Sequence, residues 1–99
     1  MTESVTRRPD ELAALRGLGD LRAAGWLFVP VTEDGAVVEL RGLRTWPHGW
    51  MDVLLLRDVS DAAGVRADPG GRIRWRREGS LSEVIDGLLV LPAPRLWTA

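Results

Sequence analysis

Hydrophobic and polar positions repeat with a helical spacing near the start of this chain. Leucine recurs at every third position from Leu12 to Leu21, which gives one broad apolar helical face. Pro9 suits the first turn of a helix, and the acidic residues that follow it favour the positive end of the helix dipole. The pattern predicts a helix over residues 9–24, weakened by internal glycines and ended by Gly25.

Further along, the spacing changes to one that is typical of strands. Residues 26–31 and 36–44 are rich in aromatic and β-branched side chains, and the pair Asp34-Gly35 between them is a strong hairpin signal. Residues 46–50 (Trp-Pro-His-Gly-Trp) have the composition of a tight turn, and residues 51–57 follow as a third strand. These segments predict an antiparallel meander.

The next part of the chain is more polar. Residues 58–71 have the composition of a connection, with one helical turn around residues 61–65. Residues 72–77 alternate charged and apolar side chains and predict a fourth strand with one solvated face.

A second helix is predicted to follow a capping box. Ser80 and Glu83 have the spacing at which the serine caps the first turn and the glutamate reaches back to the cap. The apolar stripe behind the cap consists of Leu81, Val84, Ile85, Leu88 and Leu89. Pro92 and Pro94 end the helix and favour an extended tail.

Together these elements predict an α+β fold: a helix, a four-stranded antiparallel meander sheet, and a second helix packed on one face of the sheet. A chain of 99 residues has room for one hydrophobic core. We therefore expect a single domain over residues 1–99, with flexible or extended tails at residues 1–8 and 93–99.

The third predicted strand is apolar on both faces, because the residues from Val53 to Leu56 are consecutive aliphatics. We expect the helices to cover the face of Met51, Val53 and Leu55, together with Ile73 and Trp75. The face of Leu54 and Leu56, with Asp52 and the arginines around it, would then be an apolar centre with a charged rim, as in a protein contact surface. The alternative is one helix on each face, which requires no partner.

Composition limits the chemistry. The chain has no cysteine, lysine or tyrosine and one histidine, so thiolate, amine, phenolate and multi-histidine sites are excluded. The net charge of −1 provides no general attraction to nucleic acid or an anionic membrane. Isolated aspartates match no calcium loop, and we expect neither a metal nor a cofactor. Absent cysteines and a polar start to the chain favour a cytoplasmic location.

Two features are candidates for binding. His48, flanked by Trp46 and Trp50, is either an aromatic-lined ligand or enzyme site or an exposed hairpin tip; we favour the tip. The alternating arginines of residues 72–77 either grip phosphates or form a solvated face neutralised by neighbouring acids; we favour the solvated face.

These observations favour a non-catalytic protein-binding module, homodimeric and acting as an intracellular adaptor or regulator that binds itself or another protein. The first alternative is a nucleic-acid-associated regulator that uses the arginines of residues 72–77. The second is a small-ligand protein or enzyme centred on His48. The candidate interaction surface consists of Leu54, Leu56, Arg72, Arg74, Arg76, Trp46, His48 and Trp50.

Overall fold

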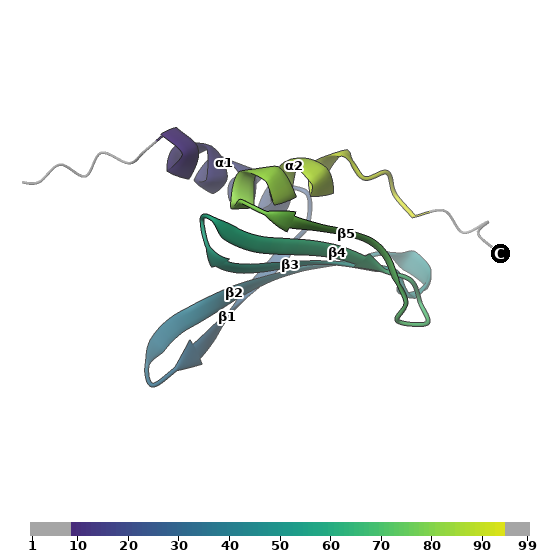
Figure 1. The fold of residues 1–99 in the computed structure, drawn as a ribbon. Coiled ribbons are helices and arrows are strands. Elements are labelled where there is room, and N and C mark those ends of the chain that lie inside the picture. Colours follow the sequence, from purple (N-terminus) through teal and green to yellow (C-terminus); the bar gives the residue numbers. More distant parts are fainter. Residues whose placement is uncertain (1–8, 95–99) are drawn as a thin grey trace, which may run out of the picture.

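The computed structural model describes residues 9–94, which form two helices and a five-stranded sheet (Figure 1). In chain order the elements are α1 (Pro9–Ala23), β1 (Leu27–Glu33), β2 (Ala36–Thr45), the 3-10 turn η1 (Pro47–Gly49), β3 (Met51–Asp58), β4 (Asp61–Ala67), β5 (Ile73–Gly79) and α2 (Leu81–Val90). Of the tails expected at residues 1–8 and 93–99, residues 1–8 and 95–99 lie outside the described residues, and residues 93–94 have no regular secondary structure. No helix in the described range has the length and apolar character needed to cross a membrane.

The sheet is an antiparallel meander with the strand order β1-β2-β3-β4-β5. The α+β architecture is confirmed, but the predicted count of four strands is wrong, because residues 61–65 belong to β4 and form no helical turn. The small residues of β4 have low intrinsic strand propensity, so its sequence resembles a connection. Packing requires the glycine among them: a Cβ atom at Gly64 would lie 2.9 Å from Cγ1 of Val84 on α2.

Local turn signals are confirmed. Asp34 and Gly35 both have positive φ, 51° and 81°, which gives the tight two-residue β1–β2 hairpin its left-handed backbone. At the next turn the backbone N–H of Trp46 donates to the carbonyl of Trp50 at 2.8 Å, and His48 between them also has positive φ, 66°.

Both helices lie on the same side of the sheet, and no described element covers the other side (Figure 1). Leu54 at the centre of β3 is fully buried against the helices, and Leu56 packs against the same core. The buried apolar core consists of Ala14, Leu21, Trp26, Leu54, Ala62, Leu81, Val84, Ile85 and Leu88.

The prediction of which sheet face the helices cover is therefore wrong. The covered face carries Leu54 and Leu56, whereas Met51 is 36% exposed and Ile73 50% exposed on the sheet. Trp75 does pack against the core, as expected. The reason is the space on either side of Leu54. Its cross-strand partners are Gly42 and Gly64, which have no side chains, so side chains of the core can pack directly on the sheet at these two positions.

The second helix follows its sequence closely. The backbone N–H of Glu83 donates to Ser80 Oγ at 3.2 Å, and the N–H of Ser80 donates to Glu83 Oε1 at 3.0 Å, which completes the capping box. The bond from the Ser80 N–H is the main cause that holds the pKa of Glu83 below its usual value. All members of the apolar stripe are buried except Leu89, which is 44% exposed.

We expect Ser80→Ala to lower the free energy of unfolding by about 0.5–2 kcal/mol, because the first turn loses its cap. Leu88→Ala should cost about 2–5 kcal/mol, because it opens a cavity beside Gly64. Urea titrations of both variants measure the two values. A harmless Leu88→Ala would contradict the packing of α2 on the sheet.

Candidate functional site

The side of the sheet that faces away from the helices is the candidate functional site. Residues that lie directly opposite one another on adjacent strands form three rows across it. The first row is Leu27, Leu43, Val53, Val65 and Arg76; the second is Val29, Arg41, Leu55, Ala63 and Glu78; the third is Thr45, Met51, Ala67 and Ile73. We call these rows, with Val31, Glu39, Arg57 and Asp61 at their end, the open face.

Aliphatic side chains dominate the open face over β1 to β4. Leu27 and Val29 on β1 are 68% and 58% exposed, and Val53, Leu55 and Val65 further in are only partly buried by their neighbours. Each apolar side chain of such a face has a higher free energy in water than it would have if it were buried against another apolar surface. Contiguous apolar surface on a folded domain marks a contact site.

Charged residues lie at the border of the open face and, with Arg41, inside its second row between Val29 and Leu55, and they pair with one another. Arg41 Nε lies 2.6 Å from Glu39 Oε2, Arg57 Nε lies 3.4 Å from Glu39 Oε1, and Arg76 pairs with Glu78. The hydrogen bond from Arg41 is the main cause that holds the pKa of Glu39 below its usual value. These charged residues therefore include both arginines and acids, and each acid named here lies beside an arginine with which it pairs.

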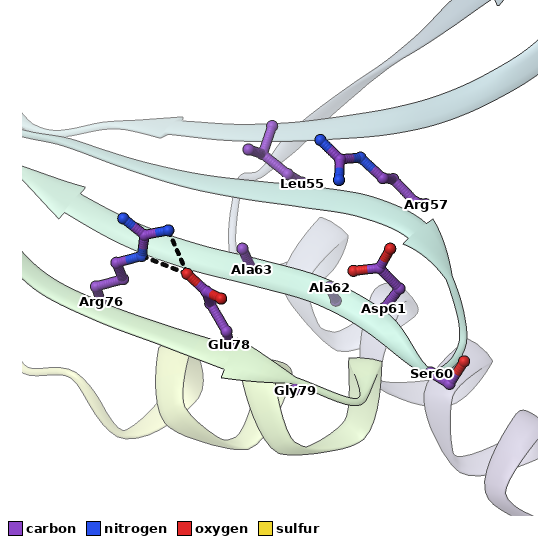
Figure 2. Close-up of a pocket in the computed structure, with 9 residues that line it drawn as sticks. All are labelled: Leu55, Arg57, Ser60, Asp61, Ala62, Ala63, Arg76, Glu78 and Gly79. Carbon is purple, nitrogen blue, oxygen red and sulfur yellow. Dashed lines mark hydrogen bonds and ion pairs between the residues drawn. The ribbon is translucent and has the colours of Figure 1, made fainter.

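A shallow hollow of about 450 Å³ lies where this border meets the apolar rows. Figure 2 shows Leu55 and Ala63 along its floor, Arg57 on one side, and the Arg76–Glu78 pair on the other. Its remaining lining residues are Ser60, Asp61, Ala62 and Gly79. The hollow is open and shallow. It is therefore a depression in the open face and does not enclose a small molecule as a ligand pocket does.

A buried ionic network lies at the end of the sheet near η1, and sequence reasoning missed it. Arg66 on β4 contacts Asp52 on β3 through two bonds, Nε to Oδ1 at 2.7 Å and Nη2 to Oδ2 at 2.9 Å. Both side chains are less than a tenth exposed. Trp46 Nε1 donates to Asp52 Oδ2 at 2.9 Å, and Arg66 Nη1 donates to the carbonyl of Pro92 at 2.5 Å.

This network has a structural role. Within the described residues, no buried side-chain nitrogen or oxygen lacks a hydrogen-bond partner, so neither charge is left free to act on a ligand. The network instead joins β3, β4, the turn before η1 and the segment after α2. The sequence offered one signal, an acid and an arginine in otherwise apolar or small-residue strands, but their pairing depends on the β3–β4 register.

The aromatic turn and the arginines come together only in part. His48 is exposed at the tip of η1, and Trp50 is 8% exposed, with the guanidinium carbon of Arg74 6.0 Å from its ring centroid. Trp46 is partly buried, and the guanidinium carbon of Arg44 lies 3.9 Å from its ring centroid. Leu54 and Leu56, the apolar centre of the expected surface, lie on the covered face, so that part of the expectation is wrong.

The expected arginine ladder is divided. A bulge between Arg66 and Ala67 interrupts the β4–β5 register beside Arg74, which binds Asp68 at 3.3 Å near the aromatic turn. Arg76 lies on the open face with Glu78. Arg72 is exposed before the start of β5, and its backbone N–H donates to Asp68 Oδ1 at 2.9 Å.

We expect no tight binding of DNA or RNA at physiological salt, because Arg74 and Arg76 already have acidic partners and the net charge is −1. Fluorescence anisotropy with single-stranded and duplex oligonucleotides measures this. Submicromolar affinity that Arg74→Glu abolishes would contradict the expectation and favour the nucleic-acid regulator.

Among residues 9–94, no three histidine, aspartate or glutamate side chains cluster in a way that could hold a metal ion. Comparison of the chain with protein-family models, curated proteins and solved structures finds no match in any of the three.

Proposed function

We propose that this chain is a non-catalytic protein-binding module and that the open face is its binding surface. The observation that carries the proposal is the aliphatic character of the open face over four strands, on the side of the sheet where the described part of the chain has no helix (Figure 1). An apolar centre with a polar border is the composition of a protein contact surface. The binding surface is thus Val53, Leu55 and their neighbours, in place of Leu54 and Leu56.

The residue content of the open face supports binding over catalysis. Its side chains are aliphatic groups, Thr45, and arginines and acids, several of which pair with one another. None of these is a nucleophile activated by a neighbouring base, and the hollow is too open to exclude water from a reaction. As an adaptor or regulator, the chain would act by occupying another protein surface.

The absence of cysteine allows a direct test. A benzophenone attached to the single thiol of Ala63→Cys reports what lies over the open face, and the same label on Ala13→Cys, exposed on α1, is the matched control. In a total protein extract of the cells that make the chain, we expect light-induced adducts of protein size from residue 63 and few from residue 13. Equal yields at the two positions, or no adduct at residue 63, would overturn the proposal.

A further inference from the structure

We infer that the protein that covers the open face is a second copy of this chain, packed sheet against sheet about a two-fold axis. The inference rests on the proposed function and names its partner.

The width of the apolar surface favours another sheet as its occupant. The first row is aliphatic over β1, β2, β3 and β4, and four strands spaced about 4.8 Å apart are roughly 19 Å wide. A single helix has a diameter of about 10–12 Å including its side chains, so it would cover about half of that width. A second sheet, packed at about 10 Å, covers all of it.

The charges of the open face favour a copy of the same face. The open face has three arginines, Arg41, Arg57 and Arg76, and three acids, Glu39, Asp61 and Glu78. This surface is neutral, so two copies do not repel each other, and a strongly acidic or basic partner gains no attraction. Most of these charges already have partners within the chain, so contact between copies requires little burial of unpaired charge.

A two-fold axis matches the arrangement of the rows. In such a dimer the same surface of both copies forms the interface. If one residue contacts a second residue of the partner, the partner's copy of the first residue contacts the second residue in return. Residues near the axis contact their own copies. The centre of the aliphatic area lies near Val53 on β3, whose direct cross-strand partners are Leu43 on β2 and Val65 on β4. Ala63 lies one strand away from Val53, on β4, so we expect a short cross-linker to reach from it to its own copy.

Sedimentation of the purified chain is the first measurement. We expect a species of twice the 10.9 kDa chain mass at high micromolar concentration, dissociating on dilution. Leu55→Asp should raise the dissociation constant about 100-fold or more, because it buries a further carboxylate in the interface, opposite an arginine, Arg41, that already pairs with Glu39. Circular dichroism establishes that the variant stays folded. Val38→Asp, at an exposed valine on β2 near the hairpin tip, is the control and should leave the dimer unchanged.

A second measurement does not depend on the folding of a charged variant. Purified Ala63→Cys treated with a short bis-maleimide should give a covalent dimer, whereas Ala13→Cys should stay monomeric. A monomer by sedimentation together with no cross-link at residue 63 would overturn the second copy as partner. So would a dimer that Leu55→Asp leaves intact, because its interface would lie elsewhere.

The two proposals fail differently. Photo-adducts from residue 63 in the cell extract, with the purified chain monomeric, would retain the binding module and reject the self-association. Absence of adducts in the extract and of dimers in the purified chain would reject both.

Discussion

Replacing Leu54 by aspartate will unfold the chain, whereas the same substitution at the adjacent Leu55 will leave it folded. Leu54 is fully buried between the sheet and the helices, so its replacement places a carboxylate in the apolar core, at a cost of several kcal/mol. That cost is a large part of the total stability of a small domain, about 5–15 kcal/mol. Leu55 points to the open face, where a carboxylate in the monomer reaches water.

Far-ultraviolet circular dichroism and urea titration of the two variants measure this difference. The pair is a matched control, since the two sites are neighbours on one strand and receive the same side chain. Unfolding by Leu55→Asp together with tolerance of Leu54→Asp would show that the helices cover the other face. Such a result would reverse both the fold and the assignment of the binding surface.

The second large effect is expected from Arg66→Ala. This substitution leaves Asp52, which is 2% exposed, without its ionic partner, and losing one member of a buried pair costs about 3–5 kcal/mol of unfolding free energy. It also removes the donor that binds the carbonyl of Pro92. Arg76→Ala removes an arginine from an exposed pair with Glu78 and should change stability too little to resolve.

Chemical denaturation of Arg66→Ala, Asp52→Ala and the double variant separates the pair from its surroundings. We expect the double variant to be more stable than the sum of the two single losses implies, because removing both members leaves no unpaired buried charge. Additive losses, or a harmless Arg66→Ala, would contradict the burial of the pair.

Sequence predicted those elements that depend on neighbouring residues. The capping box of Ser80 and Glu83 places α2, and Asp34-Gly35 places the first hairpin, because each signal lies within four residues of the backbone it controls. β4 was missed because its small residues have low strand propensity, and because the contact with α2 that leaves no room for a side chain at Gly64 is visible only in the folded chain.

The functional surface was harder to predict for a related reason. Alternation along β3 separates Leu54 from Leu55, but it does not say which of them faces the helices. The choice depends on Gly42 and Gly64, which lie on either side of Leu54 only once both neighbouring registers are set. The pairing of Asp52 with Arg66 depends on the same registers.

The meander order also determines how the chain assembles during synthesis. Every strand pairs with the next one in sequence. The β1–β2 hairpin can therefore pair with β3 before β4 has been translated. The core closes later, because the α2 side chains that cover Leu54 are made after β5. Until then the nascent sheet exposes apolar residues on both faces, which is the interval in which a chaperone or a premature contact with another nascent chain would act.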